Sequence, residues 1–169
     1  HIYTGNGKGK TTSAVGLAVR ALGHEFKVCY VYFHKNPDKY GYTEIKNLEK
    51  LGTQVYGFAK SHPFCDSETT KSSLIEQVEE GIQFIKKSVF ISNFDLLIID
   101  EIIISVRDGF LPENDLLDLI SSKPENLELI ITGRGATDKM IELADYVSNI
   151  TKIKHPYDKK VASREGIEF

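Results

Sequence analysis

Apolar runs that read as strands alternate with segments of helical periodicity along this 169-residue chain. The runs are rich in β-branched and aromatic residues and are bounded by glycine or polar residues, as the strands of a buried sheet are. We expect strands at residues 2–3, 28–33, 53–58, 96–100, 127–131 and 146–153.

Segments with apolar residues three or four positions apart lie between these strands and predict helices. We expect the helices at about residues 11–22, 44–51, 73–89, 114–119 and 139–144. Gly23 follows the first of them as a C-cap, and residues 59–67 show no period and predict a loop. The alternation of strand and helix predicts an α/β fold with a mostly parallel central sheet covered by helices on both faces.

A glycine loop stands between the first strand and the first helix, where residues 4–12 read TGNGKGKTT. The sequence matches the second half of the P-loop pattern, and Thr4 stands where that pattern has its first glycine. Gly5 and Gly7 supply the flexibility that lets backbone N–H groups form an anion nest. Lys10 brings a positive charge to the phosphates, and the Thr11 hydroxyl can bind Mg²⁺.

The order of strand, loop and helix therefore predicts a P-loop NTPase-like three-layer fold that binds ATP with Mg²⁺. The residues that we expect to bind ATP in the loop are Gly5, Asn6, Gly7, Lys8, Gly9, Lys10, Thr11 and Thr12. We expect residues 1–169 to form one such domain, since their number fits a single core. Because the chain begins at His1 rather than Met, we also expect residues missing at the N-terminus.

A second acidic site follows the apolar strand at 96–100, which ends in Asp100 and is followed directly by Glu101. A carboxylate at the end of a central strand can bind the metal directly or through its waters. The same pair of acids also suits P-loop enzymes that hydrolyse ATP, so it does not distinguish among the uses of the nucleotide.

Composition narrows the possible partners. The net charge of −3 and the absence of a Lys/Arg run argue against nucleic-acid binding. No apolar run reaches the roughly 18–20 residues that span a bilayer, so we expect no membrane partner. Cys29 and Cys65 form no CxxC pair and indicate reduced thiols of a cytoplasmic protein, with a single disulfide as the alternative.

Several short motifs occur in one order along the chain: TGNGKGKTT at 4–12, RALGH at 20–24, the acids near 100, ITGRG at 131–135, and KHP and GIEF in the tail. Together they resemble the ATP:corrinoid adenosyltransferases of the CobA/BtuR type over nearly the whole chain. The resemblance implies transfer of the 5′-deoxyadenosyl group of ATP to the cobalt of a reduced corrinoid, cob(I)alamin or cobinamide, with release of triphosphate. It also implies an electron donor such as a flavoprotein, and a homodimer.

The resemblance also assigns roles to particular residues. Cobalt(I) is the nucleophile, so the protein needs no nucleophilic side chain and works by positioning and by stabilising charge on the triphosphate. The expected catalytic residues are Lys10, Thr11 and Glu101. Thr11 and Glu101 are also the expected Mg²⁺ ligands, and Asp100 is expected to support the Mg²⁺ site as a partner of these ligands. Arg20 and Arg134 match family positions as ATP-binding residues, and a solvated charge on the helix is the alternative role for Arg20.

The chain departs from the family at the corrinoid face. The resemblance predicts a Phe-x-Trp pair after the third strand, but this chain contains no Trp. Phe58 and Phe64 are the candidate aromatic residues, and packing is the alternative role for both. His62 stands roughly where Trp is expected, and we interpret it as a surface residue rather than a cobalt ligand.

Two other functions stay open at the level of the sequence. One is a P-loop ATPase or kinase that acts on the γ-phosphate, with Glu101 as base or water-orienting group. The other is a corrinoid carrier that binds ATP without catalysis, which the missing Trp favours.

Overall fold

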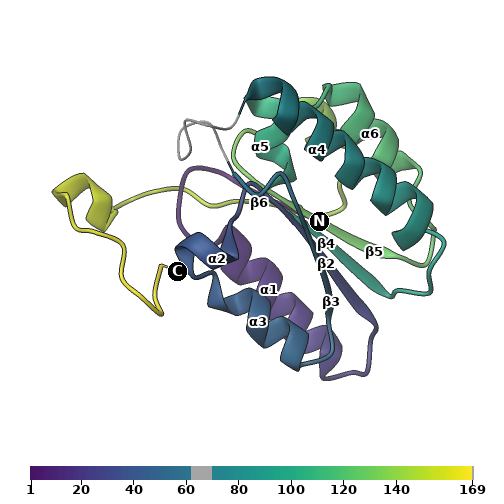
Figure 1. Ribbon diagram of the computed structural model, residues 1–169, viewed down its shortest axis with the longest axis horizontal. Helices are drawn as coiled ribbons and strands as arrows, with labels where there is room; N and C mark the ends of the chain where they lie inside the picture. Colours follow the sequence, from purple (N-terminus) through teal and green to yellow (C-terminus); the bar gives the residue numbers. More distant parts are fainter. Residues whose placement is uncertain (62–69, 169) are drawn as a thin grey trace.

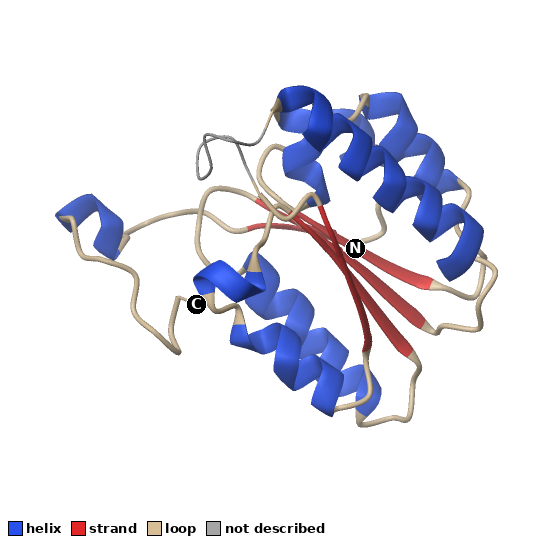
Figure 2. Cartoon of the chain, in the orientation of Figure 1, coloured by secondary structure: helices blue, strands red, loops and turns tan. Residues whose placement is uncertain are grey.

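The centre of the molecule is a six-stranded sheet in the order β3-β2-β4-β5-β1-β6, with all neighbouring strands parallel. The computed structural model describes residues 1–61 and 70–168. Figures 1 and 2 show the twisted sheet between two layers of helices. The strands are β1 (Ile2–Thr4), β2 (Val28–Phe33), β3 (Gln54–Phe58), β4 (Leu96–Asp100), β5 (Glu128–Thr132) and β6 (Val147–Asn149).

The helices divide between the two faces of the sheet. One face carries α1 (Lys10–Leu22) and α3 (Thr43–Lys50); the other carries α4 (Lys71–Phe84), α5 (Ile102–Arg107) and α6 (Glu113–Ser121) (Figure 1). The shorter elements are α2 (Pro37–Tyr40), α7 (Asp138–Leu143), a π-helix that continues α4 (Ile85–Val89) and a 3-10 turn (Pro156–Lys159). Within the described ranges, no helix combines the length and apolar character needed to cross a bilayer.

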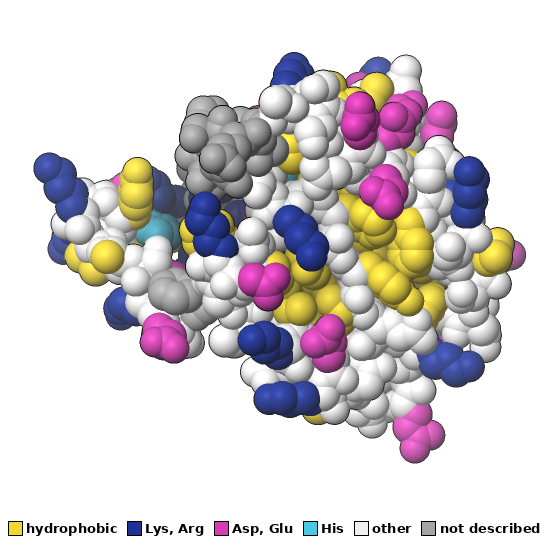
Figure 3. Space-filling view, in the orientation of Figure 1, with side chains coloured by type: hydrophobic (Ala, Val, Ile, Leu, Met, Phe, Trp, Pro, Cys, Tyr) yellow, Lys and Arg dark blue, Asp and Glu magenta, His cyan; other side chains and the backbone are white. Residues whose placement is uncertain are grey.

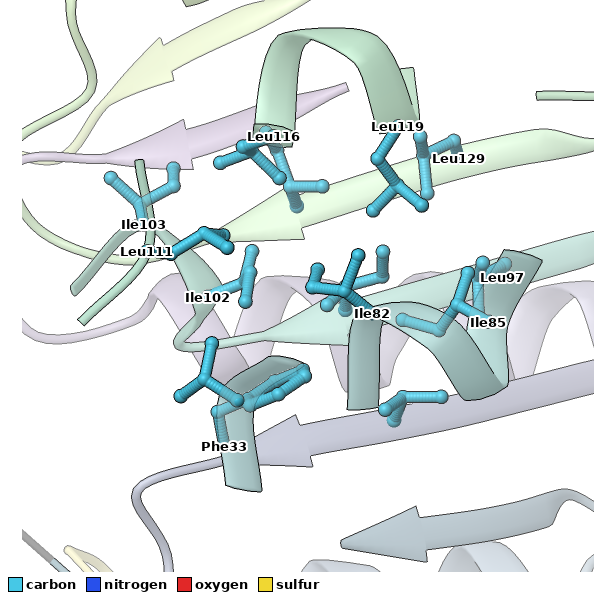
Figure 4. Close-up of a cluster of buried hydrophobic side chains, with 14 of the residues drawn as sticks. Phe33, Ile82, Ile85, Leu97, Ile102, Ile103, Leu111, Leu116, Leu119 and Leu129 are labelled. Carbon is cyan, nitrogen blue, oxygen red and sulfur yellow. The ribbon is translucent and has the colours of Figure 1, made fainter. Parts of the chain in front are cut away.

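Two cores form because successive side chains of a strand point to opposite faces of the sheet. In β2, Cys29, Val31 and Phe33 join the core under α4, α5 and α6, whereas Val28 and Tyr30 join the core under α1 and α3. Figure 4 shows the larger core, in which branched aliphatic side chains of the helices meet those of β4 and β5. A strand that is buried on both faces must be apolar throughout, and this explains the runs read from the sequence.

The prediction of an α/β fold with a central parallel sheet is confirmed, and all six strands run in the same direction. The predicted bounds of the strands at 28–33 and 96–100 match β2 and β4. The helix predicted at 73–89 is observed as α4 and its π-helical continuation. No helix was predicted at α5, because its residues Ile102–Ile104 are β-branched and continue the composition of β4.

The last strand was predicted too long. β6 contains only residues 147–149, because its partner β1 offers just the three residues of Ile2–Thr4 for pairing. Beyond it, residues 150–168 leave the sheet as an arm that projects from the body and then returns toward α2 (Figures 1 and 3). Much of this arm is exposed, including Ile153 and Tyr157.

Candidate active site

A cavity of about 830 Å³ lies at the carboxyl ends of the strands. Ligands of open parallel sheets bind at this end, where loops diverge from neighbouring strands. The lining combines the glycine loop, the residues after β2, β4 and β5, the start of α3, and the end of the arm. Its main polar members are Lys8, Lys10, Thr11, Lys35, Glu44, Glu101, Arg107, Arg134, His155 and Glu168.

The glycine loop places Lys10 and Thr11 in the first turn of α1, at the helix end where the backbone N–H groups are unpaired. Lys10 is buried, and its Nζ donates a hydrogen bond to the Gly7 carbonyl over 2.7 Å. Burial lowers the pKa of Lys10, while the carboxyl of Glu101 acts in the opposite direction. The arrangement concentrates positive charge where a phosphate chain would lie along the helix N-terminus.

Gly5 and Gly7 have a role that the sequence reading missed. The start of the arm runs across the outside of the loop, and Gly7 N donates to the Ile150 carbonyl over 2.7 Å. A Cβ on Gly7 would lie 2.8 Å from the Ile150 oxygen, and one on Gly5 would lie 2.4 Å from it. Both glycines are thus required by close backbone approach, in addition to any flexibility that the loop needs.

Asp100 is the centre of the polar network beneath the loop and is fully buried. Its oxygens accept hydrogen bonds from Thr11 Oγ1 at 3.1 and 3.2 Å, from Thr132 Oγ1 at 2.6 Å and from Tyr30 OH at 2.7 Å. Lys35 Nζ lies 2.5 Å from Asp100 Oδ2. Burial alone would raise the pKa of Asp100, but Lys35 and the hydroxyl donors outweigh it and hold that pKa below its ordinary value.

Glu101 differs from Asp100 although the two residues are adjacent. Its backbone is left-handed, with φ of 65°, and its N–H donates to Thr132 Oγ1 over 3.0 Å. The turn directs the side chain into the cavity, where Oε2 is buried without a hydrogen-bond partner among the described residues. Burial first, and then the charge of Asp100, raise the pKa of Glu101.

Thr11 and Glu101 fit a magnesium ion that is bound together with a nucleotide. The unpartnered carboxylate oxygen of Glu101 is a hard ligand of the kind Mg²⁺ prefers. The Thr11 hydroxyl donates its hydrogen bond to Asp100, so the lone pairs of Thr11 Oγ1 face away from that carboxylate. Residues 1–61 and 70–168 contain no group of three or more His, Cys, Asp or Glu residues able to hold a metal. The remaining ligands would therefore come from phosphate oxygens and water.

The other predicted site residues are placed as follows. Lys8, Gly9, Thr12 and Arg134 line the cavity together with Lys10, Thr11 and Glu101. Asn6 is outside the lining, and its Oδ1 accepts a hydrogen bond from the backbone of Lys152. Arg20 is exposed in the last turn of α1, about 15 Å along the helix axis from Lys10, and the structure does not bring it to the cavity.

The two candidate aromatic residues of the corrinoid face have different outcomes. Phe58 packs in the core, with its ring centroid 6.0 Å from that of Phe33 and 5.5 Å from that of Phe84, and it is outside the cavity lining. This is the packing alternative of the sequence analysis. Phe64 and His62 lie outside the described residues.

Sequence reasoning did not identify Lys35, Tyr30 and Thr132 as partners of Asp100. Tyr30 and Thr132 lie on the strands that flank β4, so the pairing order of the sheet brings them to Asp100. Thr132 follows the predicted strand 127–131 at its carboxyl end, whereas Tyr30 lies within the strand 28–33 and carried no local signal. His155, in the KHP motif of the tail, accepts a hydrogen bond from Tyr157 N and caps the 3-10 turn.

Known proteins are similar to this chain over nearly its whole length. The chain is 34% identical over 168 residues to a corrinoid adenosyltransferase of Escherichia coli K12, covering 99% of this chain and 84% of the relative. It is 29% identical to the corrinoid adenosyltransferase CobA of Salmonella typhimurium, with coverage of 99% and 84%, and 30% identical to that of Pseudomonas aeruginosa, with coverage of 99% and 82%.

A solved structure shows the fold alone. EssC (ATPases 2 and 3) from Geobacillus thermodenitrificans superimposes with a TM-score of 0.51 at 15% identity, covering 98% of this chain and 34% of that chain. The family model described as ATP:corrinoid adenosyltransferase BtuR/CobO/CobP matches residues 1–169. The chain therefore belongs to the BtuR/CobO/CobP family of corrinoid adenosyltransferases, and it is an enzyme of that class.

Proposed function

We propose that this enzyme transfers the 5′-deoxyadenosyl group of ATP to the cobalt of a reduced corrinoid, cob(I)alamin or cobinamide, and releases triphosphate. The proposal rests on one observation in a chain of this family: Thr11 of the glycine loop is hydrogen-bonded to Asp100, and it lines the same cavity as Glu101. A cobalt–carbon bond forms at C5′ as the bond from C5′ to the triphosphate oxygen breaks. The electron pair of the broken bond leaves with the triphosphate.

Such a displacement requires the protein to hold charge and orient ATP rather than to attack it. Lys10 and the N-terminus of α1 face the site of the triphosphate, so they stabilise the negative charge that develops on the leaving group. Arg134, in the turn after β5, adds a second cation to the same cavity. We assign ATP binding to these residues and to Lys8, Gly9, Thr11 and Thr12.

Mg²⁺ is part of the proposal, with Thr11 and Glu101 as its protein ligands and Asp100 orienting Thr11. When bound, the ion would neutralise charge on the triphosphate oxygens. Since cobalt(I) is the nucleophile, the reaction also requires an external electron donor, for which we propose a flavoprotein. A homodimer and a cytoplasmic location are further parts of the proposal, the latter supported by the buried free thiol of Cys29.

The experiment is an anaerobic assay with ATP, Mg²⁺ and chemically reduced cobalamin, in which the corrinoid spectrum and the phosphate product are both followed. We expect light-sensitive adenosylcobalamin and an equal amount of triphosphate. If ADP and phosphate form equally well without corrinoid, the enzyme is instead an ATPase or kinase that acts on the γ-phosphate of ATP. Tight ATP binding without turnover would favour a carrier.

A further inference from the structure

Lys35 is a buried lysine at the carboxyl end of β2, and its side chain is only 7% exposed. Its ammonium lies 2.5 Å from Asp100 Oδ2, 3.3 Å from Thr11 Oγ1 and 3.5 Å from Glu44 Oε1. It also lies 5.1 Å from the centre of the Tyr42 ring, as cations over aromatic faces do. These contacts place a fixed positive charge among the groups that surround the proposed metal position.

The contact with Thr11 competes with a metal. A threonine hydroxyl has one proton and two lone pairs, and here the proton is donated to Asp100. Lys35 donates to the same oxygen on its acceptor side. A magnesium ion bound to Thr11 would lie about 2.1 Å from that oxygen. Two cations so close in a buried site repel each other strongly.

We propose that Lys35 is the internal counter-cation of the nucleotide-free site: it holds the acceptor side of Thr11, one of the two proposed metal ligands, disfavours divalent ions there until ATP arrives, and leaves Thr11 when metal and ATP bind together. This inference rests on the proposed Mg·ATP site. ATP makes the exchange possible in two ways. Its phosphates supply the metal ligands that the described residues lack, and they add negative charge that both cations can share.

Binding of Mn²⁺, followed by the loss of the electron paramagnetic resonance signal of the free ion, tests this directly without any turnover. The variants are Lys35→Met, the same change combined with Asp100→Asn, and the control Lys46→Met, which alters an exposed lysine of α3 outside the cavity. Each is measured without and with ATP, after circular dichroism has shown that it is folded. Because ATP itself binds Mn²⁺, binding in the presence of ATP is the loss of signal beyond that of Mn²⁺ and ATP in buffer alone.

Without ATP, we expect Lys35→Met to bind Mn²⁺ at least about tenfold more tightly than the wild type, because the positive charge that repels the ion next to Asp100 has been removed. Lys46→Met should match the wild type, and Asp100→Asn should abolish the gain. A Lys35→Met protein with wild-type Mn²⁺ affinity would overturn the inference. So would tight Mn²⁺ binding by the wild type in the absence of ATP.

Measurements with ATP separate this inference from the proposed function. If the wild type binds no Mn²⁺ even with ATP, the proposed metal site is wrong. If it binds Mn²⁺ with ATP while Lys35→Met gains nothing without ATP, only the role of Lys35 is wrong. Should Lys35→Met fail to fold, a crystal structure of the wild type with Mg²⁺ and ATP decides. The inference requires Lys35 Nζ to have left Thr11 Oγ1, and a retained contact beside a bound ion contradicts it.

Discussion

Asp100 and Glu101 show how two adjacent carboxyl groups acquire different roles from their surroundings. Asp100 ends a buried strand and is saturated by one ammonium and three hydroxyl groups, so its pKa is lowered. Glu101 occupies a left-handed turn, keeps an unpartnered oxygen, and has a raised pKa. The first therefore anchors the loop, and the second is available to a ligand of the cavity.

Replacement of Glu101 tests this division. We expect Glu101→Gln to lower kcat by about 10²-fold, since a neutral amide is a poor ligand for the proposed Mg²⁺, which would stabilise the proposed triphosphate leaving group. The melting temperature should not fall, because the lost carboxyl has no hydrogen-bond partner for Oε2 among the described residues. The matched control is Glu80→Gln on the exposed side of α4. A Glu101→Gln enzyme with wild-type kcat would contradict the assignment.

The buried thiol of Cys29 predicts how its reactivity and its contribution to stability depend on pH. The thiol is fully buried on β2, and burial raises its pKa to about 12. At pH 8 only about 10⁻⁴ of it would be thiolate, so iodoacetamide should leave it unmodified in the native protein. In the unfolded chain the thiol ionises at lower pH, so its contribution to stability is complete below about pH 8.5 and is lost as the pH rises toward 12.

Mass spectrometry of a Cys65→Ser variant measures the reaction of Cys29 alone. We expect full modification only when denaturant is added before iodoacetamide. Rapid modification of the native variant at pH 8 would show that the β2 core opens readily.

At the scale of elements, the glycine loop is fixed from both sides, by the network around Asp100 beneath it and by the arm above it. We expect Gly7→Ala to weaken ATP binding at least about tenfold, a change of about 1.4 kcal/mol, because its Cβ would force Ile150 away. The measurement is isothermal titration calorimetry with Mg·ATP.

Gly16→Ala is the control for that variant, since a Cβ at this position of α1 meets nothing within 4 Å. It should leave ATP binding unchanged and stabilise the helix by about 0.5–1 kcal/mol. If Gly7→Ala binds ATP as tightly as Gly16→Ala does, the arm does not hold the loop in its binding conformation.

The elements also show what could be predicted from the sequence. β2 and β4 were placed with correct bounds because their burial on both faces makes each residue apolar or aromatic up to a polar boundary. α5 was missed because Ile102–Ile104 prefer strands, and the left-handed turn at Glu101 and the packing of Ile102 in the core override that preference. Local propensity cannot report a turn that depends on tertiary contacts.

At the scale of the whole molecule, the sheet order assembles the site from distant parts of the chain. Lys35 and Asp100 are 65 positions apart, and they meet because β2 and β4 pair in a register that sets Tyr32 beside Asp100. No local pattern contains that register, so the partners of Asp100 could not be predicted. Lys10, Thr11 and Glu101 were predicted from their motifs, and they line the cavity. The sheet also has an exposed edge. Its edge strand β3 is half-exposed at Tyr56, and Figure 3 shows apolar side chains at the surface between the two layers of helices.

The fold is shared with an ATPase, yet the proposed reaction breaks a different bond of ATP. Enzymes that hydrolyse ATP break the bond to the γ-phosphorus, whereas this account requires cleavage at C5′. The phosphate-binding loop serves either reaction, because it recognises the charge of the triphosphate and not the atom under attack.

The most direct test follows the C5′ atom itself. ATP labelled with ¹³C at C5′ is incubated anaerobically with the enzyme, Mg²⁺ and reduced cobalamin, and the products are examined by ¹³C and ³¹P nuclear magnetic resonance. The account predicts that the label moves into a cobalt-bound carbon that light releases, with one triphosphate formed for each. Label that remains in ADP, formed at the same rate without cobalamin, would contradict it.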